Sequence, residues 1–317
     1  MTKLLMKQSP RINDATNDFL DTHFDTPDME IIQDAIAQSH ATHHTECVQG
    51  MHLIGQAGTG KSYIVEDYAS NYPRYFEEGQ EVVPVLYVSL IQKSTSYSLI
   101  ARSLRKLTGL RRISGREEDL QARLSNRLIA AKTELVIIDE SQHLTRESSA
   151  ISAQHAADAI KSLMDETGIP FLCVGIDSSL DLLMGKSKFK KEKQLKRRNR
   201  RMYQVQPYQL GSEHWKDLMT QYQEVLSCTE DLTSDSMLKR MHIATSGLFG
   251  DLTPLFKEAI EIAGDSRLID LKVLEKAYIE FQPQSELLFN PFKASMTTIE
   301  AEITHRLDAA REAASVE

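Results

Sequence analysis

Eight consecutive residues, 55–62, combine glycines with a lysine and a hydroxyl group. They read Gly-Gln-Ala-Gly-Thr-Gly-Lys-Ser and fit the pattern G-x-x-x-x-G-K-[ST]. Glycines let the backbone wrap closely around a phosphate, so that N–H groups and the positive end of a following helix face it. Lys61 would then reach the β- and γ-phosphates of a nucleotide, and the Ser62 hydroxyl would hold Mg²⁺. The predicted phosphate-binding residues are Gly55, Gln56, Ala57, Gly58, Thr59, Gly60, Lys61 and Ser62.

Two acidic residues follow a second apolar run further along the chain. Residues 135–138 are Leu-Val-Ile-Ile, and Asp139 and Glu140 come next, which is the Walker B pattern. We expect Asp139 to position Mg²⁺ and Glu140 to orient and polarise the water that attacks the γ-phosphate. Asp177 follows another apolar run, 170–176, at the place of a γ-phosphate sensor. These residues predict ATP hydrolysis, with ATP and Mg²⁺ bound.

The chain carries a strongly basic segment although its net charge is −8. The local field rather than the net charge decides where a polyanion docks. In an oligomer, an arginine of this segment would reach the γ-phosphate bound to a neighbouring subunit. The candidates are Arg197, Arg198, Arg200 and Arg201, and we favour Arg198 and Arg201 as the catalytic residues. The segment could also contact DNA, and its outer lysines could equally form a solvated loop. Its basic residues are Lys186, Lys188, Lys190, Lys191, Lys193, Lys196, Arg197, Arg198, Arg200 and Arg201.

Two further clusters leave alternatives open. One is basic and lies on a predicted helix and its flanking turns, where it could contact DNA or form a solvated face. The other comprises His40, His43, His44 and Cys47, whose spacing could ligate zinc, although solvated residues in a short polar link are the simpler interpretation. The candidate DNA-binding residues are Lys93, Arg102, Arg105, Arg111 and Arg112.

Apolar runs that alternate with amphipathic helical patterns must position these residues. Such alternation predicts an α/β domain whose parallel sheet is covered on both faces. From Gly211 onward the pattern is helical only. The predicted strands are 51–54, 82–88, 135–138, 170–176 and 202–205, and the predicted later helices are 212–227, 234–245, 251–263, 270–281 and 298–314.

These patterns divide the chain into four expected parts. They are an N-terminal arm (1–30), an α/β nucleotide-binding domain (31–207), a helical lid (208–282) and a C-terminal tail (283–317). The tail contains a charged helix with Ile299, Ile303, Leu307 and Ala310 on one face. This stripe is expected to dock a partner, and a packed terminal helix is the alternative.

Composition narrows the class of protein. The chain has 317 residues, of which 41% are hydrophobic, and no apolar run reaches the ~18–20 residues of a membrane helix. Its N-terminus has no apolar signal core. Three separated cysteines imply no disulfide framework. We therefore expect a cytoplasmic protein without a membrane partner.

Three strings of residues carry a resemblance to a known family. They are Ile-Asp-Glu-Ser-Gln-His-Leu at 138–144, Thr-Gly-Ile-Pro-Phe-Leu-Cys-Val-Gly at 167–175, and a basic segment before Tyr203-Gln204-Val205. With the P-loop and the helical lid, they resemble the AAA+ ATPases and, more closely, the TnsC/TniB transposition regulators. These proteins choose targets for Tn7-like transposons. The resemblance covers about residues 30–265.

The resemblance implies a fold and a function. The fold is a P-loop α/β domain with a five-stranded parallel sheet, in the order 5-1-4-3-2, and an all-helical C-terminal lid. The function is that of an ATP-dependent homo-oligomer, ring or helical, which surrounds duplex DNA and recruits or activates a DDE transposase. Its expected partners are therefore duplex DNA, copies of itself, transposase subunits and a target-recruiting factor.

Two departures from the family pattern concern hydrolysis. Gly175-Ile176-Asp177 replaces the usual Gly-Thr-Pro, and Asp251 stands where many AAA+ proteins have a sensor arginine. Slow hydrolysis, or hydrolysis stimulated by DNA or a partner, is therefore expected. A helicase loader and a nucleotide-gated DNA scaffold with incidental hydrolysis remain as alternative functions.

Overall fold

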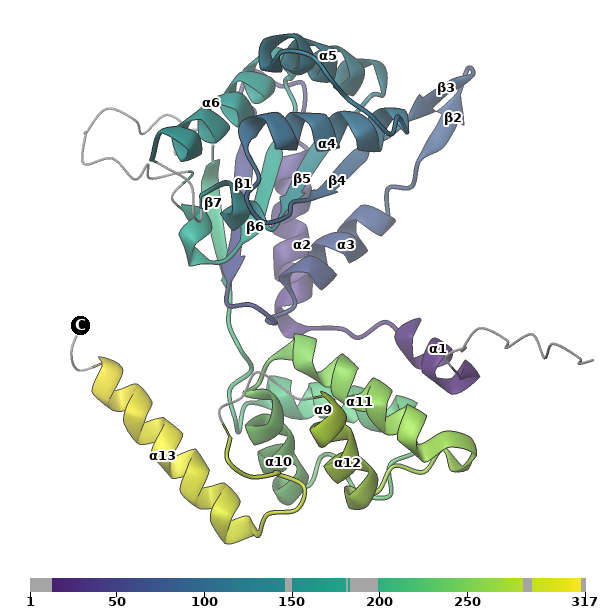
Figure 1. Cartoon of the computed structure of the whole chain (residues 1–317), viewed down its shortest axis with the longest axis vertical. Helices are drawn as coiled ribbons and strands as arrows, with labels where there is room; N and C mark the ends of the chain where they lie inside the picture. The colour runs from purple at the N-terminus through teal and green to yellow at the C-terminus, as the bar shows by residue number, and fades with distance from the viewer. Residues whose placement is uncertain (1–12, 146–149, 181, 183–198, 282–286, 315–317) are drawn as a thin grey trace, which may run out of the picture. The chain divides into compact units, whose positions relative to one another are not determined.

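A computed structural model describes residues 13–145, 150–180, 182, 199–281 and 287–314. The chain divides into two compact units (Figure 1). Residues 27–206 form an α/β unit, and the residues before 27 together with those from 207 onward form a helical unit.

The α/β unit is built on a five-stranded sheet in which every pair of neighbouring strands is parallel. The strand order is β4-β5-β6-β1-β7. If these five strands are numbered 1 to 5 in chain order and listed starting from β7, their order is 5-1-4-3-2. The predicted sheet is therefore confirmed. The strands are β1 (Gly50–Gly55), β4 (Val85–Ser89), β5 (Leu135–Asp139), β6 (Phe171–Gly175) and β7 (Asn199–Val205).

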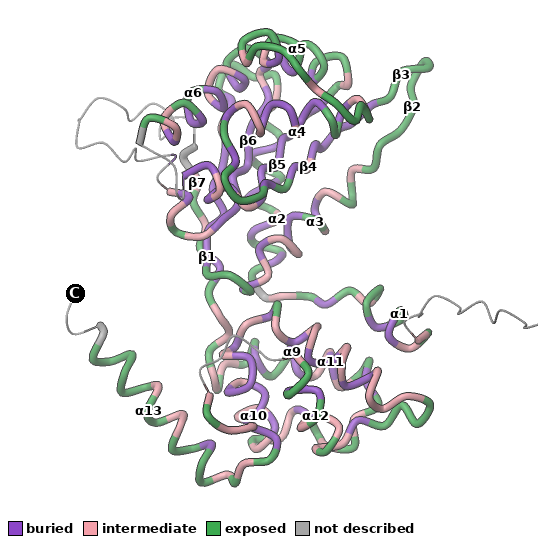
Figure 2. The backbone as a smooth tube through the Cα atoms, viewed as in Figure 1, coloured by how far each residue is buried: buried purple, intermediate pink, exposed green. Residues whose placement is uncertain are grey.

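Helices cover both faces of this sheet because successive side chains of each strand point to opposite faces. On β5, Val136 and Ile138 belong to the core beneath α4, α5 and α6, whereas Leu135 and Ile137 belong to the core beneath α2 and α3. Strands β1, β5 and β6 are accordingly buried throughout, and β4 is buried through most of its length (Figure 2). The helices are α2 (Pro27–His40), α3 (Lys61–Ser70), α4 (Ser96–Thr108), α5 (Glu117–Ala130) and α6 (Ala150–Thr167).

The predicted strand over 82–88 is confirmed for 85–88, which lie in β4, but its expected beginning at 82 is wrong. An antiparallel hairpin, β2 (Tyr75–Glu77) and β3 (Gln80–Val82), precedes β4 and is separate from the main sheet. Its turn residues Glu78 and Gly79 both have positive φ, 50° and 80°, as a two-residue hairpin turn requires. Pro84 has no N–H to donate to a ladder and separates the two strands.

The helical unit contains the predicted later helices close to their expected limits. Ser212 and Ser234 cap α9 and α10 by accepting the N–H groups of Trp215 and Met237. Trp215 and Phe256 are fully buried in its core. The helices are α9 (Glu213–Val225), α10 (Asp235–Thr245), α11 (Phe249–Ala263), α12 (Leu271–Phe281) and α13 (Met296–Ala314).

The expected N-terminal arm contains a packed helix, α1 (Asp14–Leu20), which the sequence pattern did not reveal. Asn13 caps it, and the Thr16 hydroxyl donates to Glu261 of α11 at 2.6 Å. The ring of Phe19 meets that of Phe256 at 6.5 Å. Helix α1 buries too few residues to show a clear period, and its position depends on contacts more than two hundred residues away along the chain.

The terminal helix α13 packs on its own unit through its first half. Ile299 is fully buried, and Glu300 forms a 3.2 Å ion pair with Lys239 of α10. Arg306 donates to the Ser246 hydroxyl at 3.1 Å. Leu307, further along the same face, remains 55% exposed. The alternative of a packed terminal helix therefore holds for the first half of α13. Among the described residues, each helix is too short or too polar to span a bilayer.

Candidate nucleotide-binding site

The predicted P-loop joins β1 to α3 at the carboxyl edge of the sheet. Gly58 and Gly60 have left-handed φ values of 81° and 96°, which glycine adopts at little cost. Gly60 begins α3 without a side-chain cap, so the positive end of the helix remains available to an anion. A Cβ on Gly55 would lie 2.4 Å from the carbonyl oxygen of Val205, so the neighbouring strand β7 requires glycine there. This backbone has the shape of a phosphate cradle.

Lys61 lies buried beneath this loop. Its ammonium donates to the carbonyl oxygens of Gly55 at 2.8 Å and Gln56 at 2.7 Å. Burial lowers the pKa of Lys61, while the nearby carboxylates of Glu140, Asp139 and Asp177 act in the opposite direction. The structure thus brings the lysine and all three predicted acidic residues together, although they come from separate segments of the chain.

Asp139 is buried at the carboxyl end of β5, and both of its oxygens have protein donors. Oδ2 accepts the Tyr87 hydroxyl of β4 at 2.7 Å, and Oδ1 accepts the Glu140 N–H at 2.7 Å. Burial raises the pKa of Tyr87, so this hydroxyl remains a donor at any physiological pH. Tyr87 was not predicted as a site residue; its signal was a hydroxyl among the apolar residues of a buried strand.

Glu140 follows in a left-handed conformation, with φ of 57°. The side-chain amide of Gln142 donates to Oε2 of Glu140, and Oε1 of Gln142 accepts the Ile176 N–H at 3.4 Å. Gln142 therefore connects Glu140 to the residue after β6. A Cβ on Gly175 would lie 2.5 Å from Oε1 of Gln142, so a larger residue there would displace the Gln142 side chain.

The short 3-10 turn η1 (Ser141–Leu144) holds Gln142 in this position. The Ser141 hydroxyl donates to the Val174 carbonyl of β6 at 2.8 Å. Sequence reasoning assigned no role to Ser141 or Gln142, although both lie within the family string at 138–144. The polar residues of this string thus connect the Glu140 carboxylate to the adjacent strand β6.

These groups fit a magnesium–nucleotide complex. The uncapped start of α3 and the left-handed glycines suit phosphate oxygens, and hydroxyl and carboxylate oxygens are the ligands that Mg²⁺ prefers. Ser62, the second residue of α3, and Asp139 would hold the metal. Asp177 is exposed at the start of the 3-10 turn η2 (Asp177–Leu180), at the same edge.

Of the two arginines favoured as catalytic residues, Arg201 alone lies within the described residues. Arg201 lies on β7 opposite Met51, and its guanidinium donates to Gln38 of α2 in its own chain. That bond must break before Arg201 can serve a neighbouring subunit. Arg197, Arg198 and the lysines between 186 and 196 lie outside the described residues, and only the backbone of Arg200 is described.

The five predicted DNA-binding residues do not form one cluster. Lys93 is exposed in the loop before α4, and Arg102 donates to the Ser89 carbonyl at 3.4 Å, close to the nucleotide edge. Arg105 lies exposed on the last turn of α4, and Arg111 and Arg112 are exposed beyond its end. Because α4 has 13 residues, about 20 Å separates its two ends.

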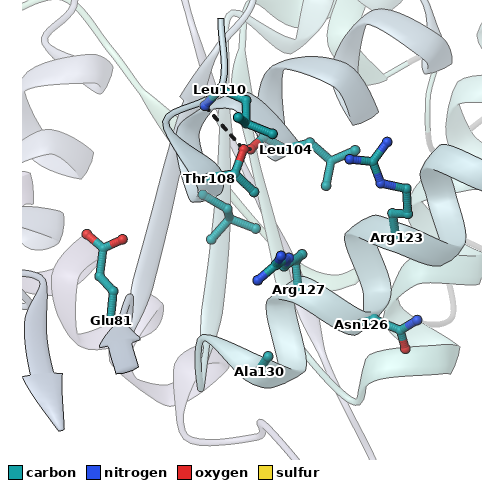
Figure 3. A pocket seen from close by; sticks show the side chains of 9 residues that line it. Glu81, Leu104, Thr108, Leu110, Arg123, Asn126, Arg127 and Ala130 are labelled. Atoms are coloured by element: carbon teal, nitrogen blue, oxygen red, sulfur yellow. Dashed lines mark hydrogen bonds between the residues drawn. The ribbon is translucent and has the colours of Figure 1, made fainter. Parts of the chain in front are cut away.

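A cavity of about 680 Å³ opens at that far end of α4 (Figure 3). Leu104, Leu107 and Leu110 form its apolar side, and Arg123 and Arg127 of α5 reach toward it. None of its lining residues belongs to the P-loop or to the carboxyl end of β5. The cavity is therefore separate from the candidate nucleotide site.

A family comparison identifies the family of the chain. The model of the bacterial TniB protein family matches residues 19–204, more than half of the chain. The chain belongs to the TniB family. The resemblance seen in the sequence is thereby confirmed, and the TniB match includes residues 55–62, Asp139, Glu140 and all of β7 except Val205. No curated protein matches the chain.

Solved structures share the AAA+ fold of this TniB-family chain. The ORC2 protein of Aeropyrum pernix in its ADP form has a TM-score of 0.58 and 17% identity, covering 85% of this chain and 73% of its own. Cdc6p from Pyrobaculum aerophilum has a TM-score of 0.58 and 14% identity, and the match covers 85% of this chain and 71% of that one. The Aeropyrum pernix ORC1 protein in complex with DNA has a TM-score of 0.56 and 16% identity, and the match covers 80% of this chain and 64% of that one.

Proposed function

We propose that this TniB-family protein is an AAA+ ATPase that assembles on duplex DNA with ATP, marks the DNA as a target and recruits or activates a DDE transposase. One observation carries the ATPase part. Lys61, Asp139 and Glu140 converge at the carboxyl edge of the sheet, and each is oriented by hydrogen bonds. The transposition part is supported by membership of the TniB family.

Each residue has a distinct role in this proposal. The P-loop backbone and Lys61 bind the phosphates, and Mg²⁺, held by Ser62 and Asp139, neutralises charge that develops on them. Glu140 orients and polarises the attacking water, with Gln142 fixing its carboxylate. Asp177 contacts the γ-phosphate region, and Arg198 of a neighbouring subunit supplies the positive charge that completes the site.

DNA binding rests on the exposed basic residues along α4. The ORC1 protein of Aeropyrum pernix, whose fold is similar, was solved in complex with DNA, and this supports a similar use of the fold here. Lys93 and Arg102 would link the DNA to the nucleotide edge, while Arg105, Arg111 and Arg112 would extend the contact along the backbone. Contacts of this kind are made to phosphates, so binding should be almost independent of sequence and strongly dependent on salt.

The decisive experiment compares ATP turnover by the wild type and Glu140→Gln, each with and without duplex DNA. We expect DNA to stimulate the wild type. The variant should bind ATP normally but turn it over at least about 100-fold more slowly, because it lacks the group that polarises water. Wild-type turnover by Glu140→Gln would refute the catalytic assignment. The same assay with Arg111 and Arg112 both changed to Gln should show weaker stimulation, and unchanged stimulation would refute their DNA role.

A nucleotide-gated scaffold is the second candidate, and Asp251 favours it. This residue lies half-buried in the first turn of α11, and burial raises the pKa of its carboxyl group. An acid there cannot supply the positive charge of a sensor arginine. If ATP drives assembly on DNA while the wild type shows no turnover under any condition, the scaffold function replaces the ATPase.

A further inference from the structure

The histidines before β1 meet an acidic residue from a distant part of the chain. His40, at the end of α2, His43 in the following link, and Glu134, directly before β5, each offer one ligand atom, and these atoms all lie within 4.8 Å of one another. His44 and Cys47 do not belong to this group. We propose that His40, His43 and Glu134 bind a zinc ion at the amino edge of the sheet, with a further position left for water.

The distances suit zinc. Nε2 of His40 lies 3.1 Å from Oε2 of Glu134. In a tetrahedral site with bonds of about 2.0–2.1 Å, neighbouring ligand atoms are about 3.3 Å apart. The half-buried His43 ring would have to move by no more than about 1.5 Å to reach the same spacing. Two imidazoles and a carboxylate are a ligand set found in zinc sites that keep an open position.

The surrounding hydrogen bonds orient both rings for this role. Nδ1 of His43 lies 2.8 Å from the His40 carbonyl, and donation to that oxygen leaves Nε2 with a free lone pair. Nδ1 of His40 lies 2.9 Å from the Tyr68 hydroxyl, which itself donates to Tyr72 at 3.4 Å. A hydroxyl engaged in this way accepts from His40, so Nε2 of His40 carries the lone pair that faces Glu134. A hydrogen bond from the other ring nitrogen to a protein oxygen is typical of metal-bound histidines.

Electrostatics favours a cation at the same place. His40 is the last residue of α2, where the helix dipole is negative, and Glu134 adds a full negative charge. A proton shared between His40 and Glu134 would satisfy those two groups, but it would leave His43 without a function. A metal ion uses all three. It would connect the end of α2 to the start of β5, at the opposite edge of the sheet from the P-loop.

The test is titration of the untagged, full-length protein with zinc chloride after removal of metals. We expect one site of micromolar or tighter affinity. His43→Ala and Glu134→Gln should each weaken it at least tenfold, and His44→Ala and Cys47→Ser should leave it unchanged. Cobalt in place of zinc should give the visible absorption of a four-coordinate ion, and His43→Ala should abolish it. Far-ultraviolet circular dichroism would verify that each variant is folded.

Three results would overturn the proposal. One is equal zinc affinity in the wild type, His43→Ala and Glu134→Gln, which would indicate surface binding or only a proton between His40 and Glu134. A second is loss of binding in His44→Ala or Cys47→Ser, which would assign zinc to the local four-residue set. The third is no binding by the wild type at micromolar zinc. Lys61→Ala should bind zinc as the wild type does, so failure of the ATPase proposal would leave this result unaffected.

Discussion

The two edges of the parallel sheet carry different chemistry. At the carboxyl edge, three carboxylates surround a lysine and a hydroxyl-bearing loop, and these are oxygen ligands suited to Mg²⁺ and phosphate. At the amino edge, Glu134 meets two imidazoles, a set suited to zinc. The difference shows that one β-strand, β5, can present an acid at each end, and that the neighbouring loops decide what each acid binds.

The two edges also differ in how far the sequence predicts them. The P-loop is contiguous, and the Walker B residues directly follow an apolar run, so local spacing is enough to find them. The amino-edge group is non-local, because His40 and Glu134 are 94 residues apart and meet only when β5 is placed beside the end of α2. The sequence therefore suggested His44 and Cys47 as companions of His40 and His43, and nothing in the local pattern pointed to Glu134.

The same distinction explains the remaining differences from the sequence predictions. The helix limits follow from long periodic segments, which local patterns describe well, whereas the sheet order was implied by the family resemblance. Tyr87 and Gln142 depend on which strands are neighbours, since Tyr87 of β4 donates to Asp139 of β5 and Gln142 accepts the N–H of Ile176 after β6. The hairpin β2–β3 was missed because Val82 and Val83 were read as the beginning of the strand beyond Pro84.

The largest expected effect comes from Lys61→Ala, which tests the carboxyl edge alone. The ammonium is the fixed positive charge beneath the P-loop, so its loss should lower ATP affinity by roughly 100-fold or more and abolish turnover. Equilibrium binding of a fluorescent ATP analogue would measure this. Exposed Lys132, which forms an ion pair with Glu77, is the matched control, and Lys132→Ala should bind ATP normally. An affinity within twofold of the wild type for Lys61→Ala would refute the site.

A smaller effect is expected for Gln142→Leu, which tests how Glu140 is positioned. The variant loses the amide that donates to the Glu140 carboxylate, a charge-assisted bond worth ~1.5 kcal/mol, so kcat should fall about tenfold. KM for ATP should change little, because the P-loop and Lys61 are untouched. His143→Ala is the control, since its ring is 3.6 Å from the same carboxylate, and it should have a weaker effect. A raised KM with unchanged kcat would instead place Gln142 in nucleotide binding.

The smallest effect concerns His52, which lies within β1 between the two edges. It is fully buried, and neither ring nitrogen has a hydrogen-bond partner in the described part of the chain. Burial lowers the pKa of His52 from its usual 6.5 to about 3. His40 has hydrogen-bond partners for both ring nitrogens, Tyr68 and Glu134. His52 has only burial acting on its pKa, and burial keeps its ring neutral in the folded protein.

This difference predicts a specific loss of stability in acid. Below pH 6.5 His52 is protonated in the unfolded chain but stays neutral in the folded protein. The free energy of unfolding therefore falls as the pH drops toward 3. At pH 5 the loss from this residue is roughly 2 kcal/mol, because each unit below 6.5 contributes about 1.36 kcal/mol. Urea unfolding at pH 7.5 and pH 5 should therefore show a smaller decrease for His52→Leu than for the wild type. His155→Leu, at an exposed position of α6, is the control and should decrease as the wild type does. Equal decreases in the wild type and His52→Leu would show that His52 gains a proton while folded, and the contrast with His40 would then be wrong.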